Sequence, residues 1–235
     1  MTKPEIDAAY TGLWMRFNSV CHNAKLIVRP RHPTGYESRP AENKTVQVKA
    51  LIYLKDWKYR ASSNRDKPVD ILVQSVETFS CDLNSMIKST VQVMYFQIEG
   101  LNANPILAVH YDFAHPIAEA HPVFHAQLGA TKFEENDIKA VDFRRQIQPL
   151  EAPHCGNLKI PTAYMNLGSV LLGLAADHLP RRFFDEFLGE LRKNKGTLWN
   201  ASCDGLQSSL RARGGFLHSH HWYLHCAKQN TPERT

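Results

Sequence analysis

Residues 46–54 read VQVKALIYL, and this stretch decides the fold. Apolar residues fill every second position in it, and they are Val46, Val48, Ala50, Ile52 and Leu54. Polar Gln47 and Lys49 fall between them. A repeat of two residues is typical of a β-strand that buries one face, because successive side chains on a strand point to opposite sides. The sequence therefore predicts a half-buried strand that begins near residue 45.

Similar segments follow this strand along the chain. Residues 69–79, 90–98 (TVQVMYFQI) and 106–113 (ILAVHYDF) are rich in β-branched and aromatic residues, and Gly100 and Pro105 mark the turn between the last two. Successive strands joined by short turns favour an antiparallel meander.

The chain before the strands predicts one helix and one loop. From Pro4, which suits the first turn of a helix, to about residue 23, apolar residues recur at three- and four-residue spacing. Residues 29–44 (RPRHPTGYESRPAENK) contain three prolines and a glycine and show no periodicity. We therefore expect a loop over residues 29–44.

Helical spacing returns after residue 149. Residues 161–178 predict a helix with Pro161 and Thr162 as its start signal, and residues 183–194 predict a second one. Weaker patterns indicate a third helix over 202–213, a last strand over 216–226 and a polar tail over 227–235.

The order of these elements defines the expected fold class. Strands come first and helices later, which favours an α+β fold: an antiparallel β-meander sheet with an N-terminal helix and a C-terminal helical layer packed on one face. We expect a single α+β domain over residues 1–235.

The composition is that of an ordinary globular protein, with 235 residues, 43% hydrophobic and 22% charged. The five cysteines lie far apart and form no CxxC pair, so we expect reduced thiols. The sequence contains neither the apolar core of a signal peptide nor an apolar run of about 18 residues. These features predict a cytoplasmic protein without a membrane segment.

The net charge of +5 favours an anionic partner, although a dedicated DNA-binding protein has a stronger basic stripe. Arg144 with Arg145, and Arg181 with Arg182, are candidate nucleic-acid-binding residues, because guanidinium groups bind phosphate through two parallel hydrogen bonds. Such pairs also occur on ordinary solvated surfaces. The GxSxG, P-loop, GxGxxG, HExxH and EF-hand patterns do not occur.

Histidines gather in one predicted hairpin, where HYDFAHP (110–116) is followed by HPVFHAQLG (121–129). If both halves are strands, His110 and Asp112 share a face of the first strand. By the same alternation, His121, His125 and Gln127 share a face of the second. If those two faces coincide, imidazole groups and a carboxylate converge.

Two chemical uses and one structural role fit such a cluster. Imidazole and carboxylate groups are ligands for divalent metals such as Zn, Mn or Mg, and an imidazole beside a carboxylate is a general base. Alternatively, the histidines only satisfy hydrogen bonds on the sheet surface.

Other histidines are weaker candidates. His218, His220, His221 and His225 form a second cluster, but on one strand they would point to two faces. His178 follows Asp177 at a predicted helix end, where a structural role is favoured because the helix dipole attracts histidine.

The segments HYDFAHP, HPVFHAQLG and LKIPTAYMNLGSVLLGLAADHLP (158–180) resemble an uncharacterised bacterial family of unknown function. In that family an H/R-x-D segment, an HPxxH segment and a helix that begins after a proline come in this order. The resemblance covers about residues 107–180. It implies a bacterial or phage-linked protein of an antiviral defence or toxin-type system and supplies no reaction.

These observations lead to one enzymatic hypothesis. A metal-assisted phosphodiester hydrolase would bind its ion through His110, Asp112 and His125, with His121 or Gln127 orienting the substrate. The mild positive charge would favour a nucleic-acid substrate.

The alternative is a non-catalytic subunit that binds a protein or nucleic-acid partner. Its contact residues would be aromatic, namely Trp57, Tyr59, Trp222 and Tyr223. A third hypothesis is a small-molecule sensor with a pocket between the sheet and the helices.

Overall fold

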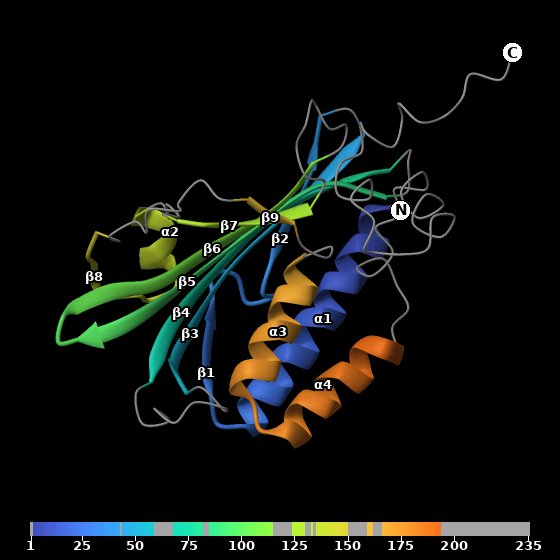
Figure 1. Cartoon of the computed structure of the whole chain (residues 1–235). Coiled ribbons are helices and arrows are strands. Elements are labelled where there is room, and N and C mark those ends of the chain that lie inside the picture. Colours follow the sequence, from blue (N-terminus) through green and yellow to red (C-terminus); the bar gives the residue numbers. More distant parts are fainter. Residues whose placement is uncertain are drawn as a thin grey trace, which may run out of the picture.

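The alternating stretch at residues 46–54 is the inner part of a long strand, β3, on which the rest of a curled, mostly antiparallel sheet is built (Figure 1). The structure is a computed structural model. It describes residues 2–42, 44–58, 68–81, 85–114, 124–129, 133, 135–149, 159–161 and 166–193.

The strands within these residues are β1 (Ile27–Pro30), β2 (Glu37–Ala41), β3 (Thr45–Trp57), β4 (Val69–Ser80), β5 (Ser85–Glu99), β6 (Asn102–Ala114), β7 (Phe124–Leu128), β8 (Gln146–Ile147) and β9 (Lys159–Pro161). The helices are α1 (Lys3–Asn23), α2 (Glu135–Ala140), α3 (Leu167–His178) and α4 (Arg181–Lys193).

The sheet order confirms the predicted meander. The strands follow one another as β1-β3-β4-β5-β6-β7-β9, so that β3 to β7 are neighbours both in sequence and in space. β2 also pairs with β3, and β8 adds a short parallel pair to β6. Because β3 to β7 are antiparallel, a short connection suffices between each strand and the next.

Bulges interrupt three of the strand pairs. The register shifts between Leu54 and Trp57 in β3, next to Thr78 in β4, and between Tyr95 and Phe96 in β5. At the last of these, Ile106 of β6 is the residue that has no counterpart on β5. A bulge bends the strand that carries it and increases the local twist, which accounts for the curl of this sheet.

The helical layer that the sequence predicts covers one face of the sheet. Figure 1 shows α1, α3 and α4 together on that face, where their apolar side chains form the main core with the inward residues of β3, β4 and β5. Phe17 of α1 stacks on Trp57 of β3, with ring centroids 6.1 Å apart, and also contacts Phe187 of α4 at 5.6 Å.

A smaller core on the opposite face was not expected from the sequence. Val141 and Phe143, which follow α2, pack on apolar side chains of β3 to β6 that include Tyr53 and Phe96. The ring of Phe143 lies edge-on to that of Tyr53, with centroids 5.1 Å apart. This core covers only part of that face, and the side chains beyond it are largely polar. We call this side, which lies opposite α1, α3 and α4 and carries only the short α2 among the described helices, the helix-free face, because none of the long helices covers it.

One buried carboxylate joins the sheet to two helices. Glu77 of β4 is fully buried on the helical side, where it accepts hydrogen bonds from the Tyr10 hydroxyl, the Ser89 hydroxyl (3.1 Å) and the Leu167 amide (2.8 Å). Burial raises the pKa of Glu77, although these three donors favour the charged form. The Leu167 amide is at the first turn of α3, so Glu77 connects α1, β4, β5 and α3.

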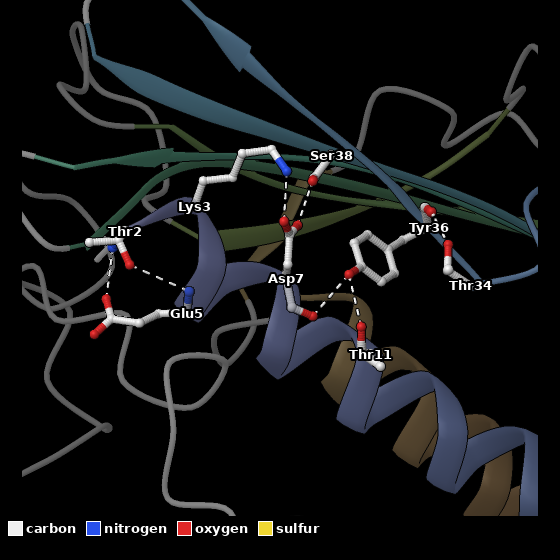
Figure 2. Close-up of polar contacts among 8 residues, drawn as sticks. All are labelled: Thr2, Lys3, Glu5, Asp7, Thr11, Thr34, Tyr36 and Ser38. Carbon is white, nitrogen blue, oxygen red and sulfur yellow. Dashed lines mark hydrogen bonds and ion pairs between the residues drawn. The ribbon is translucent and has the colours of Figure 1, made fainter.

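The predicted loop over residues 29–44 is wrong in part, because this segment holds the end of β1 and all of β2. Polar contacts fix it to α1 (Figure 2). The Asp7 carboxylate accepts from Lys3 (2.6 Å) and from the Ser38 hydroxyl, and the Tyr36 hydroxyl donates to the Asp7 carbonyl (2.9 Å). The contacts of Ser38 and Tyr36 with Asp7 are long-range, so local periodicity could not reveal them, whereas the Lys3–Asp7 pair lies within α1.

The predicted start of the first C-terminal helix is also wrong. Pro161 ends β9, and α3 begins at Leu167, after Asn166. The Asn166 side chain accepts a hydrogen bond from the Ser169 amide at 2.8 Å, which satisfies one of the unpaired donors of the first turn. Proline without an amide hydrogen is also acceptable at the edge of a sheet, where Pro161 lies.

Two other helix predictions are confirmed. α1 begins at Lys3 behind a capping box formed by Thr2 and Glu5, and α4 ends at Lys193. The helix predicted over 202–213 and the strand predicted over 216–226 lie outside the described residues. No helix among those described combines the length and the apolar composition needed to cross a bilayer.

The burial of Glu77 predicts a pH-dependent stability. A carboxyl group with a higher pKa in the folded protein than in the unfolded chain stabilises the fold at low pH, and this contribution is lost as the pH rises through the folded pKa. We expect the free energy of unfolding of the wild type, relative to Glu77→Gln, to fall as the pH rises above the ordinary glutamate pKa of about 4.3. Urea denaturation at a series of pH values measures it. Exposed Glu186→Gln is the control, and parallel curves for wild type and Glu77→Gln would contradict the prediction.

The segment between β1 and β2 predicts a steric effect. Gly35 has a φ of 78°, and a Cβ there would clash with the indole ring of Trp14, whereas Gly100 has a φ of 61° with open space around it. Alanine at either position carries backbone strain of about 1 kcal/mol. We expect Gly35→Ala to lower the free energy of unfolding by about 2 kcal/mol more than Gly100→Ala. If urea denaturation gives the same loss of unfolding free energy for both variants, the Trp14 ring moves aside for the added methyl group without cost, and the prediction is wrong.

Candidate functional site

The two halves of the histidine hairpin do form neighbouring strands. In the antiparallel pair of β6 and β7, His110 lies opposite Gln127 and Asp112 lies opposite His125. Directly paired residues on antiparallel strands share a face, so these four positions meet on one side of the sheet. Tyr111, between them, packs against the main core, which places the four on the helix-free face.

His110 and Asp112 contact each other directly. The Nε2 atom of His110 donates a hydrogen bond to Oδ2 of Asp112, and the hydroxyl of Thr90 donates to Oδ1 at 2.9 Å. The side chains of His110 and Asp112 are 28% and 30% exposed, so solvent and ligands reach both. Thr90 was missed from the sequence. Thr90 can be identified only from its position opposite Asp112, and the sequence does not give the register that pairs them.

The other members of the predicted cluster are less fully placed. For His125 the structure gives the backbone pairing with Asp112 and with Pro161 of β9, but its side chain is not among the described ones. His121 and the second cluster at His218 to His225 lie outside the described residues. Within the described part of the chain, no group of three or more histidine, cysteine, aspartate or glutamate side chains could hold a metal ion.

A polar surface extends from this pair across neighbouring strands. The row that contains His110 continues through Gln92 of β5 to Gln74 of β4. The Oε1 atom of Gln92 is buried and accepts no hydrogen bond from the described residues. A buried acceptor without a donor is costly, so the Gln92 amide is a polar group of this surface that the described residues do not satisfy.

A pocket of about 190 Å³ lies further along the same face. Its charged and amide side chains come from β2, β3, β4, α2 and the segment after β1, and they are Arg31, His32, Glu37, Lys49, Gln74 and Asp137. Asp137 of α2 forms part of its wall, and the pocket lies on the face opposite α1, α3 and α4. The sequence hypothesis of a small-molecule sensor with a pocket between the sheet and the helices stays a prediction.

The two predicted arginine pairs do not form one surface. Arg144 and Arg145 follow Phe143 of the smaller core, whereas Arg181 and Arg182 begin α4 in the helical layer, so they lie on opposite sides of the sheet (Figure 1). Asp142 accepts from Arg144, and Asp185 accepts from Arg181 at 3.4 Å.

The remaining arginines of the two pairs also have contacts within the chain. Arg145 donates to the Gly100 carbonyl at 2.6 Å, and the Arg182 guanidinium lies 4.3 Å from the centre of the Phe183 ring. Nucleic-acid binding by these arginines stays a prediction.

His178 has the structural role that was favoured for it. Its ring is buried, Nδ1 hydrogen-bonds the Lys58 carbonyl at 3.0 Å, and the ring packs between Trp57 and Tyr95. Burial lowers the pKa of His178.

One aromatic contact residue suggested by the sequence is wrong. Trp57 is fully buried against α1, so it is a core residue and offers no surface to a partner. Its large apolar ring fits the main core, which a sequence alone cannot distinguish from an interface. Tyr59, Trp222 and Tyr223 lie outside the described residues.

Comparisons with protein-family models, with curated proteins and with solved structures found no match. The resemblance of residues 107–180 to an uncharacterised bacterial family therefore stays a prediction.

Two aspartates of the sheet are expected to respond differently to substitution. Asp70 is buried and accepts from the Tyr53 hydroxyl (2.6 Å) and the Asp56 amide (2.9 Å), whereas Asp112 is partly exposed. Asp70→Ala should lower the free energy of unfolding by at least about 2 kcal/mol, because two donors lose their acceptor. Asp112→Ala should change it by less than about 1 kcal/mol. Urea denaturation compares them, and an equal loss would mean that Asp112 serves the fold.

Proposed function

We propose that the chain is a metal-assisted phosphodiester hydrolase whose centre is the His110–Asp112 pair on the helix-free face. The observation that carries this proposal is the register of β6 and β7, which puts the backbone positions of His110, Asp112, His125 and Gln127 on one face, where His110 and Asp112 are partly exposed. The side chains of His110 and Asp112 contact each other and are partly exposed, so a ligand can reach both.

The donor groups fit a divalent ion such as Zn, Mn or Mg. Nε2 of His110 is held by Asp112, and Nδ1 makes no hydrogen bond with the described residues, so Nδ1 is available as a ligand. Metal-binding histidines commonly donate their other N–H group to a carboxylate in this way. In this arrangement Asp112 supports His110 from the side of the ring away from Nδ1, and it would bind the same ion directly only after releasing Nε2 of His110. His125 lies opposite Asp112 in the register. A bound ion would supply a water ligand of lowered pKa as the nucleophile.

The chain's own residues would orient this chemistry. Asp112 accepts from His110 and so fixes the tautomer and the direction of the imidazole ring. Thr90 in turn holds Asp112. Gln127, opposite His110, offers an amide that could position a phosphate oxygen of the substrate, and His121 remains a second candidate for that role.

The substrate that we propose is a nucleic acid. The net charge of +5 favours a nucleic acid as the source of the phosphodiester, with the two arginine pairs as further contacts. We propose a cytoplasmic protein of a bacterial antiviral defence or toxin-type system, on the resemblance of residues 107–180.

Metal content and hydrolysis together test this function. Purified protein should contain about one divalent ion per chain, and it should hydrolyse bis(p-nitrophenyl) phosphate in a reaction that chelator stops. Asp112→Ala and His125→Ala should each lose the ion and lower the rate at least about 100-fold. The control is His22→Ala at an exposed position in the last turn of α1. Activity that persists in chelator with no bound metal, or an equal loss in the control, would rule the proposal out.

The second candidate is a non-catalytic subunit that binds a protein partner. It is favoured by exposed apolar side chains at the β5–β6 hairpin, where Leu101, Ile106 and Leu107 are 75%, 50% and 39% exposed. These three residues belong to one hairpin, and exposed apolar side chains are common in the contact surfaces of proteins. A wild type without hydrolytic activity that forms a stable complex in native mass spectrometry would favour this function over the first.

A further inference from the structure

The pocket and the His110–Asp112 pair belong to one continuous surface. One row of directly paired residues crosses four strands and joins them. It runs from Lys49 of β3, which lines the pocket, through Val76 of β4 and Thr90 of β5 to Asp112 of β6. Neighbouring strands are about 4.8 Å apart, so Lys49 and Asp112 are separated by about 14 Å across the sheet. Val76, Thr90, Gln74 and Gln92 form the floor between them, and all four are partly exposed.

The pocket is lined by two cationic side chains, Arg31 and Lys49, and by two carboxylates, and among the described residues Lys49 is in no ion pair. Arg31 forms an ion pair with Asp137, and His32 lies 3.4 Å from Glu37. Lys49 is partly buried, and although Glu37 lies opposite it in the register, Lys49 makes no ion pair with any residue that the structure describes. A partly desolvated ammonium group without a carboxylate partner attracts an anion more strongly than a solvated one does.

The floor between the two ends contains no charged side chain. Gln74 and Gln92 carry amides and Thr90 a hydroxyl, which can donate and accept hydrogen bonds with neutral groups. The unsatisfied Oε1 of Gln92 lies along this path. The surface therefore has a cation at one end, an imidazole and a carboxylate at the other, and neutral polar groups between them. An isolated phosphate ion cannot contact both ends, but an extended chain with more than one phosphate can.

We propose that the pocket at Lys49 binds one phosphate of a single nucleic-acid strand while another phosphodiester of the same strand lies at His110. This rests on the proposed function for the nature of the ligand, and it adds the path and direction that the strand takes, from β3 across β4 and β5 to β6. One strand can follow this row of side chains with its backbone without having to accommodate a complementary strand.

The test is the binding of a fluorescein-labelled single-stranded DNA of about 12 nucleotides, measured by fluorescence anisotropy at several salt concentrations. Lys49→Gln should weaken binding about tenfold. It should also reduce the slope of log affinity against log salt by about 0.7, the contribution of one phosphate contact on a single strand. Lys49→Arg should restore both values. Exposed Lys25→Gln, after α1, removes the same charge and should alter neither.

The outcomes separate this inference from the proposed function. If Lys49→Gln binds the strand as tightly as the wild type does, or if Lys25→Gln weakens binding equally, the pocket is not a phosphate subsite, whatever the protein hydrolyses. If inorganic phosphate competes as well as an unlabelled oligonucleotide, the extended ligand is wrong. If binding depends on Lys49 but neither protein hydrolyses phosphodiesters, the inference stands and the hydrolase proposal fails. Circular dichroism of each variant verifies its fold.

Discussion

The buried carboxylate of Glu77 is the interaction on which the arrangement of the layers depends. A charge in an apolar core is costly unless hydrogen-bond donors surround it. Here the donors come from α1, from β5 and from the first turn of α3, whose dipole also favours a negative charge. Since each donor belongs to a different element, the carboxylate is satisfied only when two helices and two strands are in their native places. It therefore selects one arrangement of the helices on the sheet.

That selection makes the two faces of the sheet unequal. The side that contains Glu77 is filled by α1, α3 and α4, and its inward residues are almost all apolar. The other side has a small core near α2, and beyond it lie amides, hydroxyls and the His110–Asp112 pair. The proposed site therefore lies on the side that the long helices leave accessible.

Local sequence pattern predicts most of the strands and helices. It does not predict which residues contact one another at the site. The period of two at residues 46–54 and the helical spacing behind Pro4 are properties of short segments, and both predictions were confirmed. The same alternation correctly placed His110 and Asp112 on one face. Thr90 and Glu77 were missed because their roles come from residues far away in the sequence. β2 was missed for the same reason, since its contacts with α1 and β3 replace a periodic core pattern.

The bulge at Ile106 has a consequence for how this protein can vary. Because side chains alternate between the two faces of a strand, the one unpaired residue in β6 decides which face every later side chain of that strand points to. Between Ile106 and Asp112, loss or gain of a single residue would exchange inside for outside and move the imidazole into the core. Insertions at the Gly100 turn carry no such penalty. Insertions and deletions in related sequences should therefore occur at the ends of the hairpins. They should be rare between Ile106 and His110.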